Sequence, residues 1–91
     1  QMAIIDKGRL LYAGTPDNAL HAIKGKIWKK SVAKAEIENI QNNFRLISTR
    51  MIAGKPMVHV YNDNAPGNEF ESIPGDLEDV FFAHIKGAVE A

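Results

Sequence analysis

Hydrophobic and polar positions at the start of the chain predict a β-hairpin. Two short apolar runs, residues 2–6 and 9–13, are separated by Lys7-Gly8. A glycine supplies the positive φ that a tight hairpin turn requires, so the two runs are predicted to be antiparallel strands joined at Gly8. Gly14 then interrupts the apolar pattern and ends the second strand.

The next segment carries the signals of a helix start. Thr15 can accept a hydrogen bond from a first-turn amide as N-cap, Pro16 suits the first helical position, and Asp17 complements the helix dipole. Gly25 is the residue expected just beyond the C-terminal end. These signals predict a short connecting helix within residues 15–25.

The middle of the chain alternates between strand and helix patterns. Residues 27–34 alternate with period two and predict a strand, whereas apolar residues three and four apart over 35–44 predict a short helix. Residues 46–53 and 57–61 are predicted strands, joined by a three-residue connection over 54–56. A hairpin is therefore expected after the helix.

The last part of the chain predicts a loop, a short strand and a helix. The sequence NDNAPGN at 62–68 is typical of a loop, and 70–73 can form a short strand. Asp76 is the predicted N-cap of the final helix, with two acidic residues in its first turn. The residues expected to form the buried stripe of this helix are Leu77, Val80, Phe81, Ile85 and Ala88.

The order of these elements, β-β-α-β-α-β-β-β-α, predicts an α+β fold. We expect a small, mostly antiparallel sheet with helices on one face, preceded by an N-terminal β-hairpin. Residues 26–73 resemble a truncated ferredoxin-like unit, in which the loop at 62–68 replaces the second helix. A chain of 91 residues can enclose one modest core.

Composition narrows the classes of function. The 11 Lys and Arg residues balance 11 Asp and Glu residues, so the net charge provides no general attraction for nucleic acid or anionic lipid. The chain has no cysteine, which excludes disulfides, thiolate metal sites and a thiol nucleophile within it. No apolar run approaches the roughly 20 residues that span a bilayer as a helix.

Two short motifs lie near opposite ends of the chain. The first consists of an apolar run, Asp-Lys-Gly-Arg, a second apolar run and Gly-Thr-Pro-Asp. Its defining positions are Asp6, Gly8, Arg9, Gly14, Thr15 and Pro16. This pattern resembles the hairpin that follows the switch histidine near the end of the ATP-binding subunit of ABC transporters.

The second motif reads Pro-Gly-Asp-Leu-Glu-Asp-Val-Phe. Its positions include Pro74, Leu77, Glu78, Asp79, Val80 and Phe81. It resembles the Pro-Ser-Leu-Glu-Asp-Val-Phe motif that closes a C-terminal accessory domain of many prokaryotic ABC ATPases, mainly those paired with export-type permeases. The chain differs by one extra residue and by Asp76 in place of Ser or Thr, and Asp is an equally good N-cap.

The resemblance implies a division of the chain and a longer parent protein. Residues 1–14 would be the terminal hairpin of an ATP-binding core, 15–25 a connecting helix and 26–91 the accessory domain. The chain opens within a strand, so we expect it to be a piece of a longer protein. It contains no Walker A loop, which the family uses to bind ATP. Catalytic, cofactor-binding and metal sites are therefore expected in the parent, with its ATP and Mg²⁺, and not in this chain.

The same resemblance implies a role, partners and a location. The chain would regulate or assemble an ATPase whose hydrolysis of ATP drives transport, and export is the expected direction. Its partners would be its own ATP-binding core, the twin copy in the ATPase dimer and, through these, a membrane permease. The expected location is the cytoplasm, at the inner face of the cell membrane.

One face of the strand that ends at Tyr61 suggests a different function. Met57, His59 and Tyr61 share this face, and Trp28 can join them. An apolar sheet face without cover is typical of a partner surface, unless the C-terminal helix covers it. The alternative hypothesis is a free-standing ferredoxin-like sensor of a small ligand that dimerises through its sheet.

Lysines around Trp28 suggest a weaker alternative, an RNA-binding module. The lysines are Lys24, Lys26, Lys29, Lys30 and Lys34. Basic residues beside an aromatic ring can bind single strands. However, period-two alternation sends Lys29 and Lys30 to opposite faces, which favours a solvated strand edge and no nucleic-acid partner.

The remaining polar candidates favour structural roles. His21, His59 and His84 share no helical turn and have no carboxylate pair at ligand spacing, so we interpret them as ordinary histidines. Glu78 and Asp79 are adjacent, and adjacent helical residues point about 100° apart. Complementation of the helix dipole is therefore favoured over acid–base chemistry.

The N-terminal hairpin also predicts self-association. In the expected parent protein its strands lie beside the catalytic core. In the isolated chain they would present unpaired backbone and apolar side chains, which favour pairing between copies.

Overall fold

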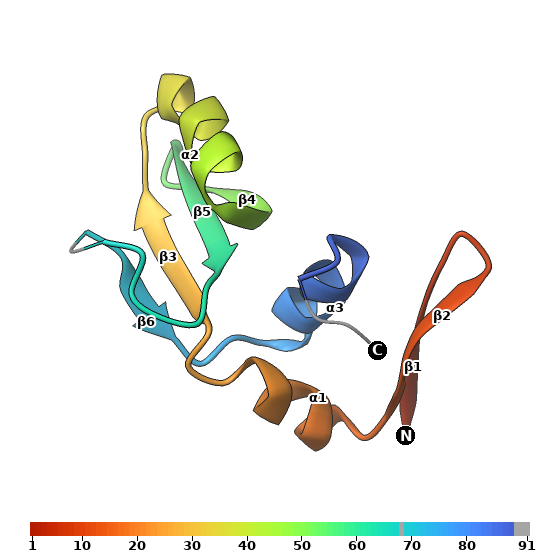
Figure 1. Cartoon of the computed structure of the whole chain (residues 1–91). Helices are drawn as coiled ribbons and strands as arrows, with labels where there is room; N and C mark the ends of the chain where they lie inside the picture. The colour runs from red at the N-terminus through yellow and green to blue at the C-terminus, as the bar shows by residue number, and fades with distance from the viewer. Residues whose placement is uncertain (68, 89–91) are drawn as a thin grey trace.

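The chain forms helices and antiparallel strands in the predicted order. The computed structural model describes residues 1–67 and 69–88. Its elements are β1 (Met2–Asp6), β2 (Arg9–Gly14), α1 (Pro16–Ile23), β3 (Ile27–Ser31), a 3₁₀ helix (Lys34–Glu36), α2 (Ile37–Asn43), β4 (Arg45–Ile52), β5 (Lys55–Tyr61), β6 (Glu71–Ile73) and α3 (Leu77–Ile85). This order confirms the α+β class (Figure 1).

Four of the strands form one antiparallel sheet in the order β4-β5-β3-β6, and β1 and β2 form a separate hairpin. The described residues between β5 and β6 form no helix, and the arrangement is compatible with a small ferredoxin-like fold. In the register of β3, Trp28 lies opposite Val60 on one side and Ser72 on the other. The lysine-rich strand is therefore interior to the sheet, and its prediction as a solvated edge was wrong.

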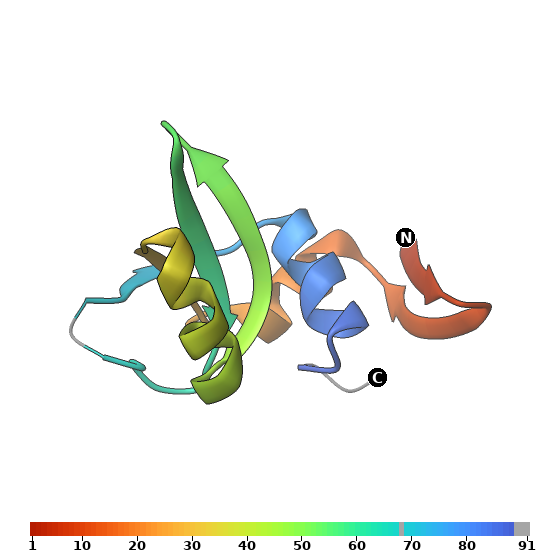
Figure 2. The same ribbon diagram turned by 90° about the horizontal axis from the view of Figure 1, so that it is seen from above.

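Helices cover both faces of this sheet, whereas the sequence predicted helices on one face. α2 packs on the face of Val58 and Val60, and α1 and α3 pack on the opposite face (Figure 2). The physical reason is that Ile27 and Ile47 make the opposite face apolar as well. A sheet with two apolar faces buries both of them.

The hairpin turns have the backbone geometry that matches the twist of paired strands. Gly8 has φ of 76°, which confirms its predicted positive φ. Between β4 and β5, Ala53 and Gly54 have φ of 52° and 81°. Because Ile52 pairs with Lys55, this connection has two residues and not the predicted three. Two consecutive positive φ values are typical of the type I′ turn that short hairpins prefer.

Hydrogen bonds mark the starts of two helices, and one strand ends earlier than predicted. Thr15 Oγ1 accepts the Asn18 amide at 3.1 Å, as expected of an N-cap. β3 ends at Ser31, three residues before the predicted end. The helix predicted over 35–44 is a 3₁₀ helix followed by α2, and the Ala33 amide caps it by donating to the Glu36 carboxylate at 2.9 Å.

α3 buries Val80 as predicted, but the rest of its buried stripe differs from the predicted one. Leu77 is 44% exposed and Phe81 is 40% exposed, although both were predicted to be buried. The buried residues of the helix are Asp79, Val80, Ala83 and His84. A stripe that contains an acid and a histidine cannot be found from hydrophobic periodicity, because that method assumes apolar buried residues.

One buried cluster joins the two ends of the chain. Its members are Ile4 from β1, Ala19 and Ile23 from α1, Ile27 and Ile47 from the sheet, and Val80 and Ala83 from α3. The hairpin lies beside α3 in both views (Figures 1 and 2). The segments 1–14, 15–25 and 26–91 thus contribute to one core.

Gly75, between β6 and α3, is a position where a side chain does not fit. Its φ is +80°, and a Cβ there would lie 2.7 Å from Ile23 Cδ1. We expect Gly75→Ala to lower the free energy of unfolding by about 2–3 kcal/mol, through backbone strain and overpacking together. Urea denaturation measures this loss.

Gly25→Ala is the matched control for this substitution. Gly25 has φ of +76°, and a Cβ there would meet no atom within 4 Å. We expect only the strain contribution, about 1 kcal/mol. Equal losses of unfolding free energy for the two variants would show that the close approach of a Cβ at position 75 to Ile23 costs nothing beyond the backbone strain.

Candidate functional site

The first turn of α3 is held by two carboxylates that cap it reciprocally. The Asp79 amide donates to Asp76 Oδ1 at 2.9 Å, and the Asp76 amide donates to Asp79 Oδ2 at 3.0 Å. This capping box confirms Asp76 as the N-cap. It also holds the Asp79 carboxylate so that its other oxygen, Oδ1, faces the sheet.

Asp79 is buried between α3 and the sheet, with 1% of its surface exposed. His59 Nδ1 lies 2.7 Å from Asp79 Oδ1, and Arg50 Nη2 donates to the same oxygen at 3.2 Å. An ionised carboxylate can only accept, so His59 Nδ1 carries the proton and donates it. The buried carboxylate thus accepts hydrogen bonds from a histidine, an arginine and a backbone amide.

The register of the sheet places these partners beneath α3. His59 on β5 lies opposite Ser48 on β4, and Arg50 follows two residues further along β4. Side chains two residues apart on a strand share a face, so Arg50 and Ser48 face α3 together with His59. Arg50 nitrogens also lie 3.6 Å from Asp76 Oδ1 and 3.5 Å from Glu78 Oε1. One arginine therefore faces all three carboxylates of the first turn.

Two opposing effects act on the Asp79 carboxyl. Burial raises its pKa, because a charge is poorly solvated away from water. The hydrogen bonds from His59 and the Asp76 amide, with the positive charges of His59 and Arg50, lower the pKa more strongly. The pKa of Asp79 therefore lies below its usual range, and the group is ionised at neutral pH.

Ser48, His59 and Asp79 are the residue types of a hydrolytic triad, but the geometry differs from one. Ser48 Oγ is buried and has no hydrogen-bond partner, so no bond joins it to the histidine. A triad requires a serine hydroxyl hydrogen-bonded to the imidazole. Asp79 and the charged groups around it instead join α3 to the sheet electrostatically. We call this set the Asp79 cluster; its members are Arg50, His59, Asp76, Glu78 and Asp79.

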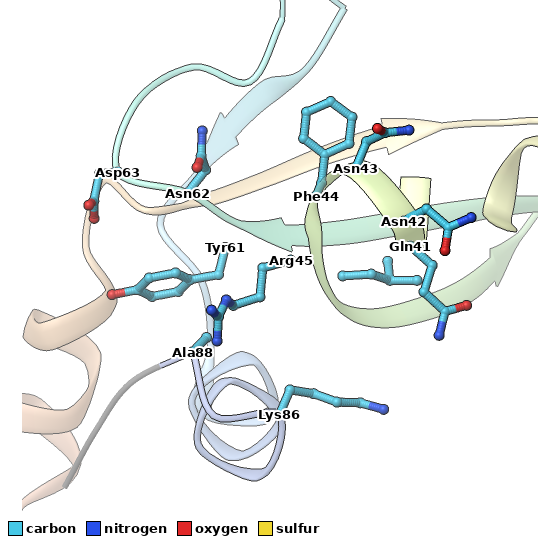
Figure 3. Close-up of a pocket in the computed structure, with 11 residues that line it drawn as sticks. Gln41, Asn42, Asn43, Phe44, Arg45, Tyr61, Asn62, Asp63, Lys86 and Ala88 are labelled. Carbon is cyan, nitrogen blue, oxygen red and sulfur yellow. The ribbon is translucent and has the colours of Figure 1, made fainter. Parts of the chain in front are cut away.

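An open cleft of about 680 Å³ lies where β4 begins and β5 ends, beside the C-terminal ends of α2 and α3 (Figure 3). Its lining residues are Gln41, Asn42, Asn43, Phe44, Arg45, Leu46, Tyr61, Asn62, Asp63, Lys86 and Ala88. Amide and charged side chains predominate among them. The cleft can therefore admit a polar small molecule, and an apolar one is disfavoured.

Several polar groups around this cleft bind the chain itself. Arg45 Nη1 donates to the Gly87 carbonyl at 2.9 Å, which satisfies a backbone group beyond the end of α3. Asn43 Nδ2 donates to the Asn39 carbonyl at 2.8 Å within α2. Asn62 Nδ2 likewise donates to the backbone, two residues ahead. These bonds stabilise the helix ends and the loop and do not converge on one point in the cleft.

The four residues predicted as one exposed face do not lie together. His59 is 6% exposed beneath α3, and Trp28, opposite Val60 in the register, lies on the other face of the sheet. Met57 and Tyr61 are half-buried on the face of His59. The C-terminal helix thus covers His59, which was one of the two expected outcomes. Trp28 was misplaced because its face depends on the register between β3 and β5.

Three of the five lysines near Trp28 have nearby carboxylates. The pairs are Lys26 with Asp63 at 3.5 Å, Lys29 with Glu71 at 3.2 Å and Lys30 with Glu69 at 2.7 Å. Lys29 and Lys30 lie opposite His59 and Val58, so they occupy opposite faces, as predicted. Their charges therefore do not form a continuous basic face.

The residues that the structure describes include no group of three or more His, Cys, Asp or Glu side chains that could hold a metal ion. His21 is exposed on α1. His84 is buried, its Nδ1 has no hydrogen-bond partner, and burial lowers its pKa. The three histidines thus occupy separate environments.

The first family-like motif forms the hairpin turn and the start of α1. Asp6 pairs with Arg9 across the turn. A Cβ at Gly14 would lie 2.7 Å from the Tyr12 hydroxyl, which donates to the Thr15 carbonyl at 3.1 Å. Gly14 therefore leaves the space for the tyrosine ring, whose hydroxyl binds the backbone just before α1, beside Thr15 and Pro16.

The second motif divides between the surface and the interior. Pro74, Leu77, Glu78 and Phe81 are exposed, whereas Asp79 and Val80 are buried. The interpretation of Asp79 as a residue that only complements the helix dipole was incomplete, because its carboxylate binds the sheet. Glu78 keeps an exposed first-turn position.

Sequence reasoning missed Arg50 and Ser48, and it missed the contact between Tyr12 and His84, whose ring centroids lie 5.3 Å apart. The sequence did contain one signal for the role of Arg50. Arg50 shares a strand face with Ser48, and an arginine at an inward position of an alternating strand indicates a buried acidic partner. The identity of that partner still depends on how α3 docks.

Comparisons of the chain with protein-family models, with curated proteins and with solved structures found no match. No helix of the described residues is long and apolar enough to cross a membrane.

The charge of Asp79 predicts a pH dependence of stability. A carboxyl with a lower pKa when folded binds fewer protons when folded, so its stabilising contribution is complete above the unfolded value, about pH 4. This contribution is lost as the pH falls through the depressed pKa of the folded state. We expect Asp79→Asn to lower the free energy of unfolding at pH 7 by about 2 kcal/mol, because charged hydrogen bonds contribute roughly 1.5–3 kcal/mol.

Urea denaturation between pH 7 and pH 2 measures this effect. The loss of stability below pH 4 should be shallower in Asp79→Asn than in the unaltered chain. Other titrating groups, such as Glu69, whose pKa the Lys30 hydrogen bond lowers, are common to both proteins and cancel in the difference. Parallel pH profiles would show that Asp79 carries no stabilising charge.

Proposed function

We propose that the chain is the non-catalytic C-terminal part of the ATP-binding subunit of an ABC transporter. It comprises the last hairpin of the ATP-binding core and an accessory domain that regulates or assembles the ATPase. The parent protein binds ATP and Mg²⁺ in the preceding core and drives transport, with export as the proposed direction. It works in the cytoplasm, where the dimer of ATPase subunits meets a permease at the membrane.

The observation that carries this proposal is that the two family-like motifs meet in space. Ile4, within the first motif's hairpin, shares a buried cluster with Val80 of the second motif. The Tyr12 and His84 rings add a contact at 5.3 Å between the same two segments. Motifs about 60 residues apart that pack on each other are expected if the accessory domain docks on the end of the core.

The ligand-sensor alternative receives less support from the geometry. A sensor that dimerises through its sheet needs an open sheet face. Here α2 covers one face, and α1 and α3 cover the other. The open cleft near Tyr61 is the feature that still favours a small ligand, and a thermal-shift screen with polar metabolites tests it.

The direct test of the proposal is the coding sequence upstream of Gln1. We expect it to encode a Walker A loop, a signature loop, a Walker B segment and a histidine shortly before Gln1. A start codon at this point, or an unrelated domain, would overturn the proposal. In the parent protein, truncation after Gly25 should change the rate of ATP hydrolysis at least threefold, roughly 0.7 kcal/mol. Glu71→Gln, at an exposed surface pair, is the control expected to leave the rate unchanged.

We also propose that the isolated chain self-associates through its hairpin. Ile5 and Leu10 are cross-strand partners, 62% and 55% exposed. In sedimentation velocity at increasing concentration we expect a dimer or larger species, which Ile5→Thr weakens. Met51→Thr, at an equally exposed residue of the other hairpin, is the matched control. A strictly monomeric profile of the unaltered chain would contradict self-association.

A further inference from the structure

The hydrophobic interior is divided by the sheet into two separate clusters. On the α2 side, Val32, Ile40, Val58 and Val60 are buried together. The second cluster, on the α3 side, contains residues of β1, α1 and α3 along with Ile27 and Ile47 of the sheet. The sheet with α2 therefore has a core of its own that includes nothing from the hairpin, α1 or α3.

The α3 side also has a polar seam. At this seam Asp79 meets His59 and Arg50, and Arg50 Nε is buried without a hydrogen-bond partner. Buried ionic groups contribute little net stability when they are intact, but they are strongly destabilising when one partner is removed. The attachment of α3 to the sheet therefore combines this charged contact with apolar packing on Ile27 and Ile47 and with the hydrogen bond from Arg45 to Gly87.

α3 is also tied to the rest of the chain at both ends. It follows Gly75, which lies against Ile23, and beyond its end the Gly87 carbonyl accepts a hydrogen bond from Arg45 of β4. The hairpin contacts α3 through Ile4 and through the tilted contact between the Tyr12 and His84 rings. Displacement of α3 from the sheet would therefore take the hairpin with it.

We propose that the Asp79 cluster is a latch that joins two cooperative units of the fold. One unit is the sheet with α2. The other consists of the hairpin, α1 and α3. Loss of the Asp79 charge opens the second unit from the first and uncovers the sheet face of Ile27 and Ile47, while the sheet stays folded. The latch is inferred from the contacts within this chain, so it does not depend on the ABC transporter assignment.

The groups that face Asp79 set the conditions under which the latch opens. From α3 and its cap these are the carboxyl groups of Asp76 and Glu78, and from the sheet they are Arg50 and His59. The Nδ1–H of His59 and the positive Arg50 hold the ionised carboxylate. Acid that protonates Asp79 removes this attraction, and the positive Arg50 then remains with His59 beneath the helix.

Amide hydrogen exchange of the full chain at pH 7, followed by segment, tests the latch. In Asp79→Asn we expect exchange in residues 2–14 and 77–88 to accelerate at least tenfold relative to the unaltered chain. Exchange in β5 and α2 should change less than twofold, because their cluster is independent of α3. Glu71→Gln, the same carboxyl-to-amide change at the exposed Lys29 pair, is the matched control and should accelerate neither unit.

Arg50→Met provides a second variant from the opposite side of the seam. It removes the arginine but keeps the capping box of α3, so the same pattern of exchange is expected from it. It also decides the test if Asp79→Asn does not fold. Equal acceleration in β5 and α3 would show that the protein opens only as a whole, and no acceleration in α3 would show that the cluster does not hold the helix. Either result overturns the latch.

Discussion

Asp79 carries a negative charge into the space between α3 and the sheet, and the way this charge is compensated determines how the helix docks. Its carboxylate accepts hydrogen bonds from His59, Arg50 and the Asp76 amide. The geometry of these bonds fixes where the three donors lie relative to α3. An uncompensated carboxylate in the same place would be far less stable than one in water. The rotation of α3, which leaves Leu77 and Phe81 at the surface, follows from placing this one group against the sheet.

The docking of α3 in turn decides what the N-terminal hairpin packs on. The hairpin has two strands and is marginal by itself. Ile4 enters the cluster formed by α1, α3 and the sheet, and Tyr12 contacts His84 on the helix. Both ends of the chain are therefore parts of one packed unit, while α2 belongs to the core on the other side of the sheet. The result is a ferredoxin-like unit whose second sheet face is covered by a further layer, formed by α1, α3 and the hairpin.

This arrangement also bears on function. The polar residues that could have formed a reactive centre are used to join α3 to the sheet, and those near the cleft of Figure 3 largely bind the chain itself. In the proposed role as a regulatory or assembly module of an ABC ATPase, contacts between segments would matter more than chemistry. A module of that kind benefits from a joint that contains one buried charge. Loss of the Asp79 charge would then weaken the whole contact between α3 and the sheet.

The amino-acid sequence by itself determined the class and order of the elements. Local signals carry this information: the Gly8 turn, the Thr15 and Asp76 caps, and the alternation of β5 are all decided within a few residues. Only the tertiary structure decided which faces are covered and which side chains meet. The face of Trp28 depends on the register between β3 and β5, and the role of Asp79 depends on Arg50 and His59, which lie 29 and 20 residues away. A carboxylate in the first turn of a helix has the same local pattern whether it faces water or a buried histidine, because its partners come from distant segments that only folding brings together.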